Sequence, residues 1–155
     1  MPVKQGELSL LQTAASKELL NSTIPMRLAY VGSDGAPRVV PIWFYWNGRD
    51  IVLGTAPKSP KVKALRKNPR VALTLDENGF PPRVLSIRGT ARLDTVPGVA
   101  QEYALAAERY LGVEQGKLWV KQLISMSPEM VRITITPDWV GYLDFQTRFP
   151  SALPL

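Results

Sequence analysis

The chain has 155 residues and is long enough to bury the hydrophobic core of one domain. It contains no cysteine and no histidine, which excludes disulfides, thiolate catalysis, a Ser-His-Asp triad and the commonest metal ligands, so no metal site is expected. The net charge of +6 favours anionic partners such as phosphorylated cofactors, nucleic acid or acidic surfaces.

Four helices are predicted in chain order. Apolar residues recur at helical spacing in each of them, and prolines mark several of their boundaries. The predicted helices span residues 8–21, 60–68, 97–111 and 113–126.

Alternating apolar residues and turn dipeptides predict seven strands. Asn47-Gly48 is the strongest hairpin signal, because both residues tolerate positive φ. The predicted strands span residues 27–31, 37–46, 51–55, 70–76, 83–93, 130–136 and 139–145. Strands joined mostly by hairpins predict a mainly β protein, a closed antiparallel barrel of six or seven strands with flanking helices. We expect a single domain over 1–155, with 1–7 and 148–155 as candidate flexible tails.

The predicted strand over 37–46 is apolar on both faces. Val39 and Trp43 share one face, and Val40 and Ile42 share the other. Both faces therefore need a cover, which is either the inside of a barrel or a ligand or partner subunit. Pro41 lacks a backbone N–H, so it belongs at a sheet edge or an irregularity.

A basic segment follows the third predicted strand. Ser59 is a suitable N-cap, and Pro60 fits the first helical position. A helix start attracts anions, and three lysines surround this one: Lys58, Lys61 and Lys63. The segment is interpreted as a phosphate site, with a solvated basic helix face as the alternative. In strand five, Gly89 is expected at a bulge or a close backbone approach.

Three motifs resemble the pyridoxamine 5′-phosphate oxidase-like family, the FMN-binding split barrels. They are Leu28-Ala-Tyr-Val with Asp34-Gly-Ala-Pro-Arg-Val-Val-Pro-Ile-Trp-Phe, Thr55 with Ser59-Pro-Lys-Val-Lys-Ala-Leu, and Asn68-Pro-Arg-Val-Ala-Leu. The resemblance covers residues 8–143 and implies a homodimer with a flavin at the subunit interface. It implies that the second strand lies along the flavin ring, through Arg38, Val39, Val40, Pro41 and Ile42. It also implies a phosphate held by Ser59, Lys61 and Lys63, with Thr55 and Ala56 nearby.

The chain departs from the family pattern at several positions. Pro60 stands where the typical oxidase has arginine, Trp43 replaces a lysine, and Val84 replaces a glutamine. The histidine that grips pyridoxal phosphate is absent, so oxidation of vitamin B6 is not expected. The chain is more similar to the flavin or deazaflavin reductases of this fold.

The resemblance implies an oxidoreductase that transfers hydride between FMN and a small organic substrate. One alternative is a reductase that uses the deazaflavin coenzyme F420, whose longer acidic tail would meet Lys58, Arg66 and Lys67. A further alternative is a non-catalytic flavin-binding or sequestering protein, in which haem ligation by imidazole is excluded. Nucleic-acid binding is not expected, because no aromatic residues interleave with the basic ones.

No catalytic residue is assigned from the sequence. Trp43, Tyr45 and Trp139 are candidates to line the substrate side, and Tyr30 and Tyr142 are candidate proton donors. No stretch approaches the ~20 apolar residues of a membrane span. The N-terminus lacks the apolar core of a signal peptide, so a cytoplasmic protein is expected.

Overall fold

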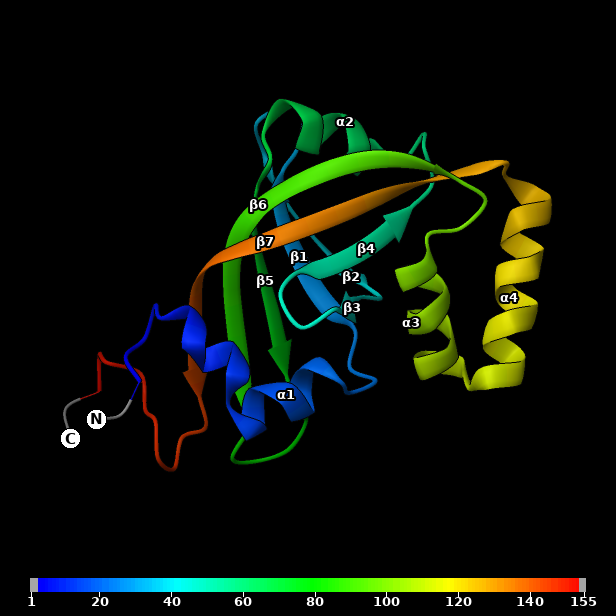
Figure 1. Ribbon diagram of the computed structural model, residues 1–155. Coiled ribbons are helices and arrows are strands. Elements are labelled where there is room, and N and C mark those ends of the chain that lie inside the picture. Colours follow the sequence, from blue (N-terminus) through cyan, green and yellow to red (C-terminus); the bar gives the residue numbers. More distant parts are fainter. Residues whose placement is uncertain (1–2, 154–155) are drawn as a thin grey trace.

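The computed structural model describes residues 3–153, and its core is a single antiparallel sheet (Figure 1). The sheet has seven strands in the order β2-β1-β5-β6-β7-β4-β3. The strands are β1 (Met26–Val31), β2 (Pro37–Ile42), β3 (Tyr45–Trp46), β4 (Ile51–Thr55), β5 (Arg70–Asp76), β6 (Val84–Pro97) and β7 (Glu129–Leu143). The predicted mainly β architecture of seven antiparallel strands is confirmed.

Helices flank the sheet at three places. They are the 3-10 helix η1 (Leu8–Gln12), α1 (Ala14–Leu20), α2 (Pro60–Lys67), α3 (Gln101–Leu111) and α4 (Val113–Met126). α1 and α2 lie at opposite ends of the sheet, whereas α3 and α4 form a pair at its side, next to β4 (Figure 1). None of the helices within residues 3–153 combines the length and hydropathy needed to cross a membrane.

The strands curl around one hydrophobic core. Leu28, Leu53, Leu73, Ile87 and Ile133 come from five different strands, and each is at most 3% exposed. Such convergence requires the sheet to bend into a barrel. The two edge strands of the sheet, β2 and β3, are consecutive in sequence. Within the described residues, no hydrogen-bonded pairing joins them. The barrel is therefore open between these two strands.

The strand predicted over 37–46 is interrupted, which corrects the sequence prediction. β2 ends at Ile42, and β3 contains only Tyr45 and Trp46. The Phe44 carbonyl accepts a hydrogen bond from the Arg109 guanidinium of α3 instead of from a neighbouring strand. The side chain of Phe44 is fully buried in the core. A helix side chain thus replaces the strand ladder at this point.

Two further predictions about strands and helices were wrong. The predicted strands 130–136 and 139–145 are one strand, β7, which passes through Pro137. The strand predicted over 83–93 continues to Pro97, so the following helix begins at Gln101 and not at residue 97. The register of β6 against β7 shifts between Arg88 and Gly89, which confirms the predicted bulge.

The N-terminal segment from residue 3 packs against β7, and the segment after β7 is bonded to it. The predicted helix 8–21 is divided at Thr13, whose side chain caps α1 by accepting the Ser16 N–H. The Gln5 side chain exchanges two hydrogen bonds with the Tyr142 backbone, at 2.6 and 2.8 Å. Arg148 donates to the Val3 carbonyl. Of the two candidate tails, residues 1–2 and 154–155 lie outside the described residues.

Candidate functional site

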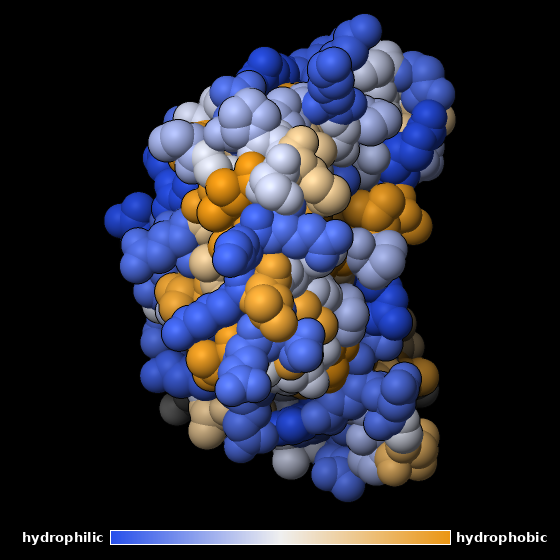
Figure 2. All heavy atoms as spheres, turned by 90° about the vertical axis from the view of Figure 1, so that its right-hand side faces the viewer, coloured by the Kyte–Doolittle hydropathy of each residue, from blue (hydrophilic) through white to orange (hydrophobic). Residues whose placement is uncertain are grey.

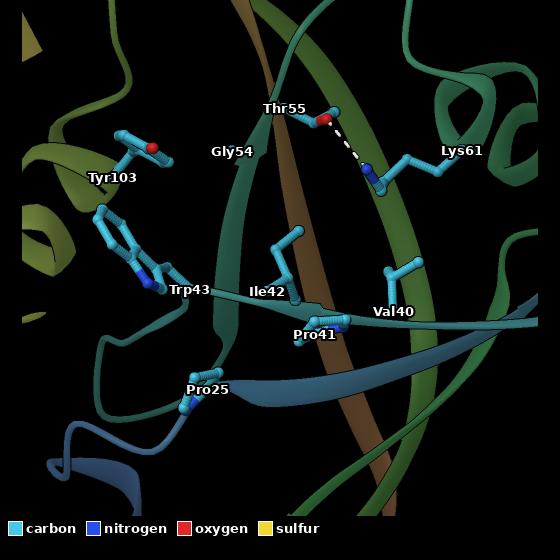
Figure 3. Close-up of a pocket in the computed structure, with 9 residues that line it drawn as sticks. All are labelled: Pro25, Val40, Pro41, Ile42, Trp43, Gly54, Thr55, Lys61 and Tyr103. Carbon is cyan, nitrogen blue, oxygen red and sulfur yellow. Dashed lines mark hydrogen bonds between the residues drawn. The ribbon is translucent and has the colours of Figure 1, made fainter.

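The open side of the barrel contains a pocket of about 460 Å³ (Figure 3). Its walls come from β2, β4, α3 and the residues that begin α2. Pro25, Val40, Pro41, Ile42, Trp43, Gly54, Thr55, Lys61 and Tyr103 line it. A mostly apolar concave site with a few polar groups is the usual form of a small-molecule site.

The pocket exists because the barrel does not close here. β3 pairs only with Ile51 and Val52 of β4, so the last residues of β4 have no strand partner on that side. Pro41 of β2 has no N–H with which to build a ladder across the gap. Val40 and Ile42 cover the core below and form the pocket floor.

One end of the pocket carries a lysine between two hydroxyls. The Lys61 ammonium donates to the Thr55 hydroxyl at 3.3 Å and to the Ser59 hydroxyl at 3.1 Å. Ser59 occupies the N-cap position of α2 as predicted, but its side chain makes no capping hydrogen bond there. Both hydroxyls accept from Lys61, so each keeps its own proton for another acceptor.

Within the described part of the chain, the charge of Lys61 has no partner carboxylate. No ion pair with Lys61 occurs among residues 3–153, and the residue is half-buried. Burial lowers the pKa of Lys61 from its ordinary value of 10.5, because desolvation penalises the charged form. An anion bound at this end would supply the missing countercharge. Three donors next to a helix start suit a phosphate.

Two aromatic side chains form the opposite side of the pocket (Figure 3). The rings of Trp43 and Tyr103 lie with centroids 6.1 Å apart, and Trp43 stacks on Tyr110 at 5.0 Å and 8°. Gly54 lets Tyr103 lie directly on β4, since a Cβ there would be 2.7 Å from Tyr103 Cδ2. No larger residue at position 54 leaves both the ring and the strand in place.

α3 fixes the loops that carry this aromatic wall. The Arg109 guanidinium donates to the carbonyls of Ser22 and Phe44, and the Tyr110 hydroxyl donates to the Ile24 carbonyl. These bonds tie the segment before β1 and the segment after β2 to one helix. Trp43 is therefore held on a rigid support.

The structure gathers only part of the predicted site residues in this pocket. Val40, Pro41, Ile42, Thr55 and Lys61 line it, and Ser59 joins through its bond to Lys61. The other predicted positions lie around it.

Arg38 and Val39 lie outside this pocket, on two other surfaces of the protein. Arg38 pairs with Asp34 at 2.7 Å, and Val39 lines a separate hollow on the outer face of the sheet. Ala56 and Lys63 are exposed next to the lysine end.

The aromatic candidates divide in a similar way. Trp43 lines the pocket, whereas Tyr45 does not. Trp139 lies on the outer face of the sheet, under the Arg88 guanidinium at 4.1 Å. Of the candidate proton donors, Tyr30 borders a different hollow near α2, and Tyr142 is buried.

Three pocket residues were not identified from the sequence: Pro25, Gly54 and Tyr103. Tyr103 lies in the helix predicted over 97–111, where an aromatic residue at helical spacing is typical of core packing. Gly54 carried a usable signal, because a glycine inside a strand often marks a close approach. Pro25 served only to end the first helix.

An antiparallel barrel that is open at one side, with an apolar pocket between a lysine and two aromatic rings, defines a split barrel. The family model described as pyridoxamine 5′-phosphate oxidase matches residues 12–144. The chain therefore belongs to this family. No curated protein sequence matches the chain significantly.

Solved structures share the same fold. An F420 reductase is 26% identical, with a TM-score of 0.64 over 81% of this chain and 94% of that protein. A conserved hypothetical protein from Mycobacterium tuberculosis is 24% identical, with a TM-score of 0.70 over 93% of this chain and 91% of its own. The haem storage protein HutZ from Vibrio cholerae is 18% identical, with a TM-score of 0.59 over 83% and 90%. The last two similarities show the fold alone.

Proposed function

We propose that this pocket binds a flavin-type cofactor and that the protein is an oxidoreductase, transferring hydride between FMN and a small organic substrate. The observation that carries the proposal is Lys61, a half-buried ammonium without a carboxylate partner among the described residues, at the end of an apolar pocket. Membership in the pyridoxamine 5′-phosphate oxidase family supports a cofactor of this kind.

The residues present fit such a cofactor. We assign the phosphate to the lysine end, where an ammonium and two hydroxyls converge. When bound, the cofactor supplies the hydride chemistry, which no side chain of the chain provides. The assignment gives the phosphate to Thr55, Ser59 and Lys61 with Ala56 and Lys63 beside them, and the ring to Val40, Pro41 and Ile42. Arg38 and Val39, which the resemblance also implied, face other surfaces and are not assigned to the ring.

The role of the protein is then placement and exclusion of water. Val40, Pro41 and Ile42 present an apolar surface to a flat ring. An apolar wall strengthens electrostatic interactions inside the pocket and keeps water from the reacting atoms. Lys61 neutralises the phosphate, and its position at the start of α2 adds the favourable end of the helix dipole.

Equilibrium binding of FMN and riboflavin tests this assignment. The two ligands differ only in the phosphate. Lys61→Ala should weaken FMN binding by about 10- to 100-fold, the worth of hydrogen bonds to a charged group, and leave riboflavin binding unchanged. Lys121→Ala removes an exposed lysine on α4, outside the pocket, and is the matched control, with no effect expected. Equal loss in both variants, or none, would contradict the assignment.

Deazaflavin coenzyme F420 is the second candidate. The observation that favours it is the 26% identity to an F420 reductase across most of both chains. Lys58, Arg66 and Lys67 are exposed on and beside α2, where the acidic tail of the coenzyme would meet them. The same titration with this coenzyme decides the choice: tighter binding than FMN, weakened by Arg66→Ala, assigns the site to the deazaflavin.

A binding protein without turnover is the third candidate. One structural neighbour, HutZ, is a haem storage protein, but its identity of 18% supports only the fold. This chain has no histidine to ligate haem iron. Without oxygen, return of the oxidised cofactor's visible absorbance on adding an organic acceptor would support the enzyme, because the acceptor has then taken the hydride. A bound cofactor that stays reduced with all acceptors would support sequestration.

We also propose that the active form is a homodimer. Two adjoining hollows on the outer sheet face share Ala29, Ala72 and Arg88. Val39 is 67% exposed at the edge of this surface. Because Val39 and Val40 lie on opposite faces of one strand, a partner on the outer face would stabilise the strand that forms the pocket floor.

A further inference from the structure

Tyr103 lines the pocket, and its side chain carries a hydroxyl that is able to donate a hydrogen bond. Its hydroxyl oxygen accepts the indole N–H of Trp119 at 3.0 Å. An indole N–H can only donate, so the hydroxyl is the acceptor and its own proton is directed elsewhere. Among residues 3–153 no acceptor for that proton is recorded. The hydroxyl is therefore oriented and still able to donate.

The position of Tyr103 is fixed from two sides. Its ring rests on the backbone of β4 at Gly54. Trp119 reaches it from α4, and α4 contacts α3 at Gly116, where a Cβ would be 2.6 Å from the Glu108 backbone. A donor held in this way loses little conformational freedom when a ligand binds.

The aromatic side of the pocket is electrically neutral. Lys61, on the opposite side, is the one charged residue that lines the pocket in the described part of the chain. Glu102, which precedes Tyr103 on α3, is paired with Arg132. That guanidinium, by hydrogen bonding, lowers the pKa of Glu102 and keeps it ionised and paired. The Tyr103 hydroxyl is a neutral donor on the aromatic side of the pocket. It therefore suits an uncharged acceptor atom on a flat ring better than a charged acceptor.

We propose that Tyr103 donates a hydrogen bond to a carbonyl oxygen of an uncharged, flat ring bound in this pocket, and that Trp119 holds the hydroxyl in that orientation. The inference deepens the proposed function, on which it rests for the identity of the cofactor. The carbonyl has two sources, the flavin-type ring or a small neutral substrate. The experiment has one arm for each.

The first arm uses the full chain without added cofactor and two isosteric probes, 2-acetylnaphthalene and 2-isopropenylnaphthalene. Tyr103→Phe should weaken binding of the ketone about 3- to 10-fold, the worth of one neutral hydrogen bond, and leave the hydrocarbon unchanged. Tyr30→Phe removes a hydroxyl outside the pocket and is the matched control. Trp119→Phe keeps the Tyr103 hydroxyl but removes the indole N–H that orients it. We therefore expect this variant to weaken ketone binding less than Tyr103→Phe does.

The second arm separates the two sources of the carbonyl. Weaker FMN binding in Tyr103→Phe assigns the bond to the cofactor ring. Weaker binding of the ketone to the FMN-saturated Tyr103→Phe variant assigns the hydrogen bond to the substrate. Unchanged binding of both ligands in a Tyr103→Phe variant that melts like the wild type overturns the inference, as does wild-type protein that fails to prefer the ketone.

Failure of the proposed function gives a different pattern. Wild-type protein that binds no FMN would end the cofactor assignment, and the naphthalene pair would still decide the role of Tyr103. Lys61→Ala should weaken the binding of FMN and leave the binding of the ketone to cofactor-free protein unchanged. The two claims therefore fail separately.

Discussion

At the scale of single residues, the lowered pKa of Lys61 predicts a pH dependence. Burial places the pKa of the folded lysine below its ordinary 10.5. Between these two values the unfolded chain binds more protons, so this group's contribution to folding stability rises with pH. Phosphate binding requires the charged form of Lys61. The affinity for the phosphate therefore falls as the pH rises, whereas the contribution to folding stability increases. Measured from about pH 7 upward, the FMN-to-riboflavin affinity ratio should fall at a lower pH than it would for an exposed lysine, whose pKa is about 10.4.

A variant with a permanent charge provides the control for this pH effect. Lys61→Arg places a guanidinium at the site, which stays protonated throughout this range. Its affinity ratio should remain flat, as should that of Lys61→Ala at a lower level. A wild-type ratio that is also flat up to about pH 10 would show that Lys61 does not hold the phosphate.

The polar part of the candidate site could be predicted from the sequence because it is local. Thr55, Ser59 and Lys61 lie within one strand-loop-helix segment, so their spacing determines that they meet. Tyr103 could not be predicted in the same way. It reaches the pocket through the packing of α3 on Gly54, a contact between segments distant in the chain.

At the scale of secondary-structure elements, the α3–α4 contact is expected to be sensitive to size. A Cβ at Gly116 would lie 2.6 Å from Glu108 Cα and N, which are backbone atoms and cannot rotate away. Gly116→Ala should therefore reduce the free energy of unfolding by about 1–3 kcal/mol, measured by urea denaturation. It should also weaken the Trp119–Tyr103 bond by separating the helices.

The matched control for this change is on the same helix. Gln115 is exposed on α4, so Gln115→Ala should alter stability by no more than about 0.5 kcal/mol. If Gly116→Ala proved as stable as this control, the close helix contact would not hold in solution.

The elements that the sequence predicted well have strong local signals, such as the Pro60 start of α2 and the turn at Asn47-Gly48. The errors lie where tertiary contacts override those signals. The strand over 37–46 breaks because Arg109 binds the Phe44 carbonyl. β7 passes through Pro137 because Pro137 lies opposite the bulge at Gly89, where a Cβ would be 2.4 Å from the Thr136 carbonyl oxygen.

At the scale of the whole molecule, a dimer should depend on the outer sheet face. Val39→Glu places a charge on an apolar surface and should yield monomers in sedimentation velocity experiments. Because a partner on the outer face stabilises the strand that forms the pocket floor, FMN binding should weaken in parallel.

A charge on another exposed apolar residue is the control for the dimer. Leu118 on α4 is 59% exposed, and on that side of the molecule polar side chains interrupt the apolar ones (Figure 2). Leu118→Glu should leave the oligomeric state unchanged. Dimers that survive Val39→Glu and dissociate with Leu118→Glu would move the interface to the helices.

The crystal structure of the protein with FMN tests the central claim most directly. We predict the phosphate within hydrogen-bonding distance of Lys61 Nζ and the hydroxyls of Ser59 and Thr55, with the ring against Val40–Ile42. A phosphate bound elsewhere, with the Lys61 ammonium still bonded only to the two hydroxyls, would contradict the account.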